Sequence, residues 1–183
     1  LHAAFGFPVL LRGEVLSVIE FFSREIREPD ADLLSMLTTV GNQIGMFIDR
    51  RRAQEERDRF FTLSLDMLCV IGFDGSLKRV NPAWHRILGY DEADLLSRQY
   101  LDFIHTDDRE ATIAEAAKLT EGKDVLYFEN RYWHKDGTLR WILWAAAPIR
   151  EQQIAYAAGR DITEHKAAEE TMARDARDLH LPR

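Results

Sequence analysis

The chain has 183 residues, of which 46% are hydrophobic, so it can build at least one full core and one or two modest domains. Lys and Arg total 24 against 31 for Asp and Glu, and the net charge of -7 disfavours nucleic acid or an anionic membrane as a partner. The single cysteine, Cys69, has no internal disulfide partner and lies in an apolar run, which predicts a buried thiol in a reducing, cytoplasmic setting.

The apolar stretches are too short to cross a membrane. The longest, Ala3 to Leu11, falls well below the roughly 20 residues that a spanning helix needs, and no basic-then-apolar leader opens the chain. We therefore expect a soluble chain without membrane contact. It begins at Leu1 without a methionine and ends at Arg183, so we expect both ends to be cut from a longer protein.

The first third of the chain predicts a β-hairpin followed by a long helix. Residues 5–10 and 15–22 are apolar runs rich in β-formers, split by the turn pair Arg12-Gly13. Pro29-Asp30 then opens a helix in which apolar residues recur at alternating spacings of four and three, the seam of a coiled coil or a packed bundle. These residues are Leu33, Leu37, Val40, Ile44 and Phe47. Residues 49–59 are almost wholly charged, and the helix is expected to continue through them as a linker.

A second hairpin, a group of helices and three more strands are predicted next. Strands over 67–73 and 77–80 are joined by Asp74-Gly75, and helices follow over 82–88, 91–96 and about 106–120. Further strands cover 125–133, 139–149 and 154–159. This order indicates an α+β fold, an antiparallel five-stranded sheet with helices inserted between strands two and three. Asp161 stands three residues before Glu164, a capping-box pattern that predicts an exit helix carrying Ile162, Met172 and Leu179.

A series of short motifs runs in a fixed order from about Phe60 to Lys166. They are Gly72-Phe73-Asp74-Gly75, Val80-Asn81-Pro82-Ala83, Leu88-Gly89-Tyr90, Phe103-Ile104-His105, Asp107-Asp108-Arg109, Phe128-Glu129-Asn130-Arg131-Tyr132, Lys135-Asp136-Gly137, Arg140-Trp141 and Gly159-Arg160-Asp161-Ile162-Thr163-Glu164. In this order and spacing they resemble the PAS domain with its C-terminal PAC motif, a sensor module of bacterial signalling proteins.

Residues from about Ala3 to Arg52 resemble the last two strands and the C-terminal helix of a GAF domain. The pocket of such a domain would be built by residues before Leu1, so no ligand is expected in this part. The implied organisation has four segments. These are 1–52, the C-terminal part of a GAF-like domain; 53–60, a charged helical linker; 61–163, the PAS/PAC sensor domain; and 164–183, the start of an output-coupling helix.

The sequence carries no signature of catalysis. It has no Gly-rich phosphate loop with a following Lys, no Cys-x-x-Cys, no His-Glu-x-x-His and no Gly-x-Ser-x-Gly. His165 and His180 on the exit helix lack the His-Glu context of a phosphoacceptor site, and we expect both to be solvent-exposed. We therefore expect no catalytic residues and no metal site in this chain, and a kinase core would lie beyond Arg183.

The candidates for a ligand pocket are aromatic. Trp84, Phe103, Trp141 and Trp144 are placed to line a cavity between the sheet and the inserted helices. Strand alternation over residues 139–147 puts Trp141 and Trp144 on opposite faces, so only one of these two can face the core. In the structural alternative, the inward side chain simply fills the interior of a small domain.

The resemblance also implies what a cofactor would need. A flavin photosensor of this family has a cysteine on the helix beside the flavin in an Asn-Cys-Arg context, whereas Cys69 lies on a predicted strand. A haem sensor needs an axial ligand, usually a histidine on the long inserted helix, and residues 109–123 contain none. His105, just before that helix, is expected to make a local hydrogen bond. We therefore expect no cofactor and a colourless protein.

Asp161 and Thr163 match the family's Asp-Ile-Thr hinge between the last strand and the exit helix. As a cap, such a residue contributes about 1 kcal/mol. Because it stands at the one joint through which sheet movement must pass, we expect it also to bias the exit helix between two arrangements. Asp161 and Thr163 are therefore the predicted signal-coupling residues.

The function that the resemblance implies is cytoplasmic signal reception and relay. The first candidate for the parent protein is a sensor histidine kinase, and the second is a cyclic-dinucleotide synthase or hydrolase. A ligand-free dimerisation spacer and a protein-docking platform on the outer sheet face are the alternatives. A cavity of roughly a few hundred Å³ would favour the sensor, a solid core the spacer, and an exposed apolar patch the platform. Expected partners are a second copy through the flanking helices, a small-molecule ligand, and a linked output domain beyond Arg183.

Overall fold

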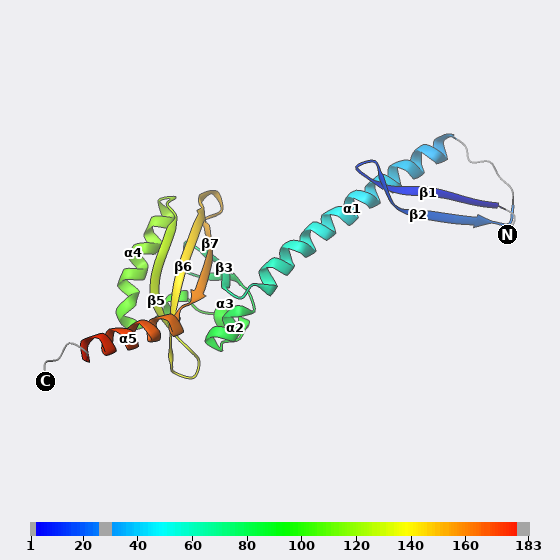
Figure 1. The fold of residues 1–183 in the computed structure, drawn as a ribbon. Coiled ribbons are helices and arrows are strands. Elements are labelled where there is room, and N and C mark those ends of the chain that lie inside the picture. Colours follow the sequence, from blue (N-terminus) through cyan, green and yellow to red (C-terminus); the bar gives the residue numbers. More distant parts are fainter. Residues whose placement is uncertain (1–2, 26–30, 179–183) are drawn as a thin grey trace. The chain divides into compact units, whose positions relative to one another are not determined.

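The computed structural model describes residues 3–25 and 31–178, which form two compact units that divide after Phe60 (Figure 1). The predicted helix start at Pro29-Asp30 and the predicted exit-helix residues Leu179 and His180 lie outside the described residues. Within the described ranges, each helix is too short or too polar to cross a lipid bilayer.

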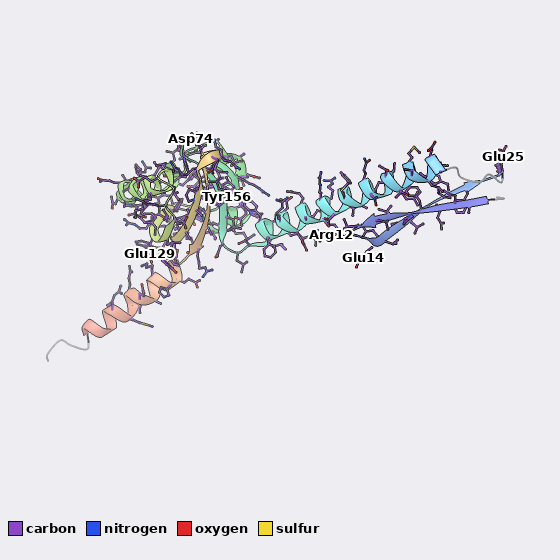
Figure 2. The ribbon with its side chains drawn as sticks, turned by 90° about the horizontal axis from the view of Figure 1, so that it is seen from above. Arg12, Glu14, Glu25, Asp74, Glu129 and Tyr156 are labelled. Atoms are coloured by element: carbon purple, nitrogen blue, oxygen red, sulfur yellow. The ribbon has the colours of Figure 1, made fainter. Side chains whose placement is uncertain are left out.

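The first unit contains the expected β-hairpin and most of a long helix. Strands β1 (Ala3–Leu11) and β2 (Glu14–Ser23) pair antiparallel. Arg12 and Gly13 both have positive φ angles, 53° and 88°, as a type I′ hairpin turn requires. Arg12, labelled at this turn in Figure 2, lies 3.6 Å from the carboxylate of Asp49 on helix α1 (Ala31–Leu63).

Two glycines let α1 lie against the hairpin (Figure 1). Gly41 and Gly45 are buried in the helix, one turn apart. A Cβ atom on Gly41 would lie 2.5 Å from the carbonyl oxygen of Pro8, and one on Gly45 would collide with the carbonyl oxygen of Leu10. Because both obstacles are backbone atoms, a side chain at either glycine would push the helix away from β1.

The predicted apolar seam of α1 is divided between the hairpin side and solvent. Leu37 and Ile44 are half-buried, next to the two glycines in helical spacing. Leu33, Val40 and Phe47 are exposed by 40%, 37% and 63%. The seam therefore supplies part of the packing inside the first unit and leaves apolar side chains open.

The second unit is built on one antiparallel sheet of five strands in the order β4-β3-β7-β6-β5. The strands are β3 (Met67–Gly72), β4 (Leu77–Val80), β5 (Val125–Trp133), β6 (Leu139–Ile149) and β7 (Ile154–Asp161). Between β4 and β5 the chain forms helices α2 (Ala83–Leu88), α3 (Glu92–Leu96) and α4 (Arg109–Thr120), with 3-10 turns at Tyr100–Phe103 and Thr106–Asp108. Helix α5 (Thr163–Asp178) follows β7. The predicted α+β class, the five-stranded sheet and the place of the inserted helices are confirmed.

The Asn81-Pro82 motif ties the start of the sheet together. The Asn81 side chain is 2% exposed, and its Oδ1 accepts from the backbone N–H of Leu68 at 2.9 Å. Its Nδ2 donates to the carbonyl oxygens of Phe61 and Asp66, each at 3.0 Å. A buried amide with three hydrogen bonds to the backbone fixes the backbone around it, so Asn81 holds the segment that enters β3.

The core of the second unit lies between the sheet and the inserted helices. Figure 1 shows α4 alongside β5, with α2 and α3 near the other end of the sheet. Its largest fully buried side chains come from both the sheet and the inserted helical segment. They are Trp84, Phe103, Met67, Leu88, Leu95, Ile104 and Ile142. Strand β7 extends past the predicted end at residue 159, because Arg160 and Asp161 still pair with β6.

Candidate functional site

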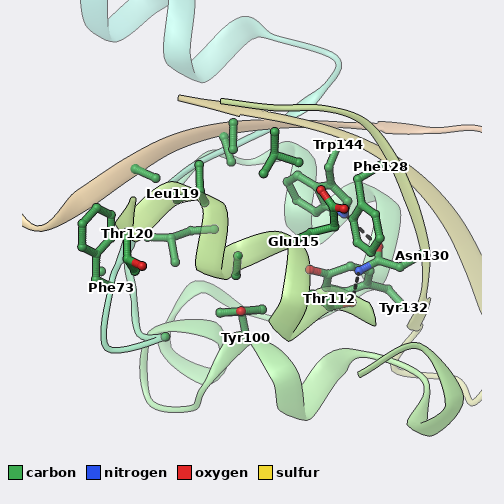
Figure 3. Close-up of a pocket in the computed structure, with 18 residues that line it drawn as sticks. Phe73, Tyr100, Thr112, Glu115, Leu119, Thr120, Phe128, Asn130, Tyr132 and Trp144 are labelled. Atoms are coloured by element: carbon green, nitrogen blue, oxygen red, sulfur yellow. Dashed lines mark hydrogen bonds between the residues drawn. The ribbon is translucent and has the colours of Figure 1, made fainter. Parts of the chain in front are cut away.

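A cavity of about 100 Å³ lies between α4 and the inner face of the sheet (Figure 3). Its walls come from the β3–β4 hairpin, from the 3-10 turn at Tyr100–Phe103, from α4 and from β5, β6 and β7. They consist of Ile71, Gly72, Phe73, Gly75, Tyr100, Thr112, Glu115, Ala116, Leu119, Thr120, Val125, Phe128, Asn130, Tyr132, Trp144, Ala146, Ala155 and Ala157. The cavity is smaller than the roughly 300 Å³ at which pockets for drug-sized ligands begin, and smaller than the few hundred Å³ expected for the sensor.

One end of this cavity carries a buried polar cluster. Asn130 on β5 is 1% exposed; its Nδ2 donates to Thr112 Oγ1 at 3.0 Å, and its Oδ1 accepts from Trp144 Nε1 at 3.0 Å (Figure 3). The Thr112 hydroxyl in turn donates to the carbonyl oxygen of Asp108 at 2.7 Å. An amide has four hydrogen-bonding positions, and these two hydrogen bonds fill one donor and one acceptor position of Asn130.

Aromatic side chains form the wall behind the polar cluster. The rings of Trp84, Tyr132 and Trp144 lie 5.7 to 6.1 Å apart, centre to centre. The Trp144 indole packs against β7 at residue 159, where a glycine is needed because a Cβ atom would come within 2.7 Å of the ring. Burial raises the pKa of Tyr132 well above its ordinary value, so its hydroxyl is neutral in the folded protein.

Of the four predicted pocket residues, one lines the cavity and the other three lie elsewhere in the domain. Trp144 lines the cavity, and Trp84 lies behind it in the core. Phe103 is fully buried against Tyr90, with ring centres 4.9 Å apart, and is absent from the lining. Trp141 is half-buried on the opposite sheet face, so of the two alternating tryptophans only Trp144 faces inward, as strand alternation demands.

Three residues in the cavity lining were not among the predicted pocket candidates: Asn130, Thr112 and Phe128. A signal was present in the motif Phe128-Glu129-Asn130-Arg131-Tyr132. Its first, third and fifth residues share one strand face, and a lone amide between two aromatic residues on a core face indicates a buried polar contact.

The joint between the sheet and the exit helix is held by Asp161 and Thr163. The Asp161 carboxylate accepts from the backbone N–H of Thr163 at 2.9 Å and from its hydroxyl. The Thr163 hydroxyl also accepts from the backbone N–H of Trp141 at 2.9 Å. Asp161 is the last residue of β7 and α5 begins at Thr163, so the N-cap position is Ile162. The predicted capping box that starts at Asp161 is therefore corrected: the Asp161 side chain forms a turn with Thr163, one residue before the N-cap.

Three charged side chains surround Trp141 on the outer face of the sheet. The guanidinium of Arg131 and the ammonium of Lys166 each lie 5.4 Å from its ring, in cation–π range. Lys166, in the second turn of α5, forms an ion pair with Glu129 on β5. Hydrogen bonding to Glu129 raises the pKa of Lys166 above its ordinary value.

Arg131 connects this outer cluster to α4. Its Nε donates to Asp108 Oδ2 at 2.9 Å, its Nη2 donates to Oδ1, and its backbone N–H donates to Oδ2 at 2.7 Å. These hydrogen bonds hold the pKa of the Asp108 carboxyl below its ordinary value. Since the Asp108 carbonyl accepts from Thr112, contacts run without a gap from the cavity through Asp108, Arg131 and Trp141 to α5.

The remaining singled-out side chains have local partners. His105 Nδ1 accepts from the backbone N–H of Asp107 at 3.3 Å, and its ring packs against Trp133 at an interplanar angle of 35°, with centres 5.2 Å apart. His165 is exposed and lies 3.7 Å from Glu169. Cys69 is buried on β3, and burial raises the pKa of its thiol. No group of three His, Cys, Asp or Glu side chains in residues 3–25 and 31–178 is placed to hold a metal ion.

Residues 78–157 match a family model described as the PAS fold. Similar solved structures include the PAS domain of an HTR-like protein from Haloarcula marismortui, with 24% identity, a TM-score of 0.55 and coverage of 64% of this chain and 98% of that one. A PAS domain from Colwellia psychrerythraea has 24% identity and a TM-score of 0.55, covering 61% of this chain and 98% of that one.

A third similar structure is a domain of a sensory box sensor histidine kinase/response regulator from Geobacter sulfurreducens, with 19% identity and a TM-score of 0.52; 58% of this chain and 92% of that chain are covered. A search of curated proteins gives no match. The family model lies within the second unit and the three structures share its architecture. The second unit therefore has the PAS fold.

Proposed function

We propose that the second unit senses a small ligand in the cavity beneath α4 and relays its presence to α5. The observation that carries this proposal is the unbroken set of contacts from the Asn130 cluster through Asp108, Arg131 and Trp141 to the exit helix. A ligand that shifts α4 relative to β5 changes these contacts, and the helix that begins at Thr163 responds.

The lining restricts the class of ligand. A cavity of about 100 Å³ lies below the roughly 150 Å³ of an apolar cavity that binds benzene, so a bound molecule has only a few heavy atoms unless side chains move. Most of the lining is apolar; its polar groups are the Asn130 amide, the Glu115 carboxylate, which pairs with Lys118, and the hydroxyls of Thr112, Thr120, Tyr100 and Tyr132. The favoured ligand is small and neutral, with at most one or two polar atoms that pair with Asn130.

The proposal extends to the parent protein. The PAC-like motifs, the GAF-like hairpin and helix, and a structural neighbour described as a sensor histidine kinase/response regulator support a multi-domain, cytoplasmic signalling protein. In it, this chain is a non-catalytic sensory part, and α5 leads toward a linked output domain. The exposed seam residues Leu33, Val40 and Phe47 support pairing of the flanking helices with a second copy.

A ligand-free spacer is the second candidate, favoured by the small cavity volume. Xenon binding distinguishes the sensor from the spacer, because xenon is small and apolar and, when bound, shifts the amide resonances of the residues around it. The sensor predicts shifts at Ala116, Val125 and Phe128 that saturate with xenon pressure. Ala116→Leu, which fills the cavity, should abolish them, whereas Ala114→Leu on the exposed side of α4 should not. Absence of saturable shifts in the unmodified chain would leave the spacer as the function.

A further inference from the structure

A short connection joins the end of α1 to the start of β3. It belongs to the second unit, together with Phe61 in the last turn of α1. Arg86 on α2 donates to the carbonyl oxygen of Ser64 in this connection at 2.7 Å. Asn81 donates to the carbonyl oxygens of Phe61 and Asp66, each at 3.0 Å. The end of α1 and the start of β3 are therefore tied to the same part of the domain.

The last residue of this connection forms an ion pair with β7, the neighbour of β3 in the sheet (Figure 1). Asp66 Oδ1 accepts from Arg160 Nε at 3.2 Å, and Oδ2 accepts from Nη2 at 3.0 Å, so the contact is bidentate. Met67 pairs with Gly159 in the sheet, which sets the two charged residues opposite each other. Because the Trp144 ring fills the space at Gly159 on the cavity side, Arg160 points to the outer face of the sheet.

Arg160 stands directly before the joint between the sheet and the exit helix. The next residue, Asp161, ends β7, and its carboxylate accepts from the backbone N–H of Thr163, where α5 begins. The backbone of Arg160 itself is still paired with Leu143 on β6. A displacement of Arg160 along or across the sheet therefore moves Asp161 relative to the first turn of α5.

The exposure of this ion pair limits what it can do for stability. The Arg160 side chain is 68% exposed and that of Asp66 is 33% exposed. Ion pairs in contact with solvent contribute little to the free energy of unfolding. A bidentate contact between a guanidinium and a carboxylate nevertheless fixes the relative position and orientation of its two partners. The pair is therefore better suited to transmit a displacement than to hold the domain together.

We infer that the Asp66–Arg160 ion pair links α1 directly to α5, so that a movement of the end of α1 changes the exit helix without involving the cavity. A rotation of the last turn of α1 moves Asp66, Asp66 carries Arg160 with it, and the hold of Asp161 on Thr163 changes. This goes beyond the proposed function, because it gives the domain a second input. It does not depend on whether the cavity binds a ligand.

A double-mutant cycle on the full chain tests the link. Phe61→Ala loosens the end of α1, and Asp66→Asn breaks the ion pair. The readout is hydrogen exchange of the backbone amides of Thr163 and Lys166, which donate to Asp161 and Ile162. Each single variant should accelerate this exchange about threefold. The double variant should exchange no faster than the faster single one, because the second change then acts on a broken link. Effects that multiply in the double variant overturn the inference.

A matched control and a charge exchange complete the test. Lys78→Gln removes another exposed ion pair of the same sheet, formed with Asp74 at 3.2 Å, and should leave exchange in α5 unchanged. Asp66→Arg and Arg160→Asp should each accelerate exchange, and the chain with both changes should regain most of its protection, since a carboxylate again faces a guanidinium. Exchange that stays fast in that chain, or an Asp66→Asn variant that behaves like Lys78→Gln, contradicts the link. If circular dichroism shows Phe61→Ala to be unfolded, the charge exchange decides alone.

Discussion

For single residues, the sequence predicted which side chains share a strand face, but not which face is buried or which partners a buried side chain has. Strand alternation put Trp141 and Trp144 on opposite faces, but it did not say which one faces inward. That choice depends on Gly159, which leaves room for the Trp144 indole across β7. The pairing of Asn130 with both Trp144 and Thr112 joins residues on three elements. The strand motif indicates that Asn130 makes a buried polar contact, but its partners on the other elements are fixed only by packing.

The Asp108–Arg131 pair predicts how the second unit responds to acid. Hydrogen bonds from Arg131 lower the folded-state pKa of Asp108, so the pair's stabilisation is fully present above the unfolded pKa of about 3.9 and is lost as the pH falls through the folded value. Urea unfolding at several pH values should show Asp108→Asn to be less stable than the unmodified chain near neutrality, with the gap closing under acid.

Glu110→Gln is the matched control, because Glu110 is an acidic residue in the first turn of α4 and is exposed. Its unfolding curve should follow that of the unmodified chain at every pH. A stability gap for Asp108→Asn that stays constant down to low pH would show that Asp108 acts through packing rather than through its charge.

At the scale of elements, local turn chemistry explains why the order of strands and helices was predictable. Gly75, Gly89 and Gly137 all take the positive φ angles that their predicted turns or helix end require. The end of β7 was less predictable. Arg160 and Asp161 stay in the sheet because β6 is long enough to pair with them, which depends on a distant strand. The resemblance pointed to Asp161 and Thr163, whose signal-coupling role stays a prediction, but the hydrogen bonds that these two residues make needed the structure.

Asp161 should matter more for the exit helix than for the domain. Its carboxylate holds Thr163, and Thr163 holds the backbone of Trp141, so Asp161→Ala releases the first turn of α5 from β6. Losing the side-chain hydrogen bonds of this turn costs about 1 kcal/mol against a domain stability of roughly 5–15 kcal/mol. Thermal unfolding should therefore change little, while hydrogen exchange in the first turn of α5 should accelerate about fivefold.

Glu164→Ala provides the comparison, since Glu164 is also in the first turn but exposed. It should leave exchange in α5 nearly unchanged. If Asp161→Ala lowers the unfolding temperature by many degrees, or leaves α5 exchange as it was, Asp161 is an ordinary structural residue.

At the scale of the whole molecule, the sequence indicated two sheet-and-helix parts, and the structure divides after Phe60. The size of the cavity was beyond sequence reasoning, because it is the volume left over when Trp84, Tyr132 and Trp144 pack together. Interiors are packed so closely that a few ångströms in one ring decide between a cavity and a solid core. The small cavity volume limits the size of any ligand that the cavity can hold, and it has no bearing on the fold assignment.

If filling the cavity changes the stability of α5, hydrogen exchange of the backbone amides of Thr163–Asp178 will report it. Ala116→Leu fills the cavity and so imitates a bound ligand, while Ala114→Leu adds the same side chain on the exposed side of α4. The account predicts that Ala116→Leu slows exchange in the first turn of α5 several-fold and that Ala114→Leu does not. Equal exchange in α5 for both variants and the unmodified chain would contradict it.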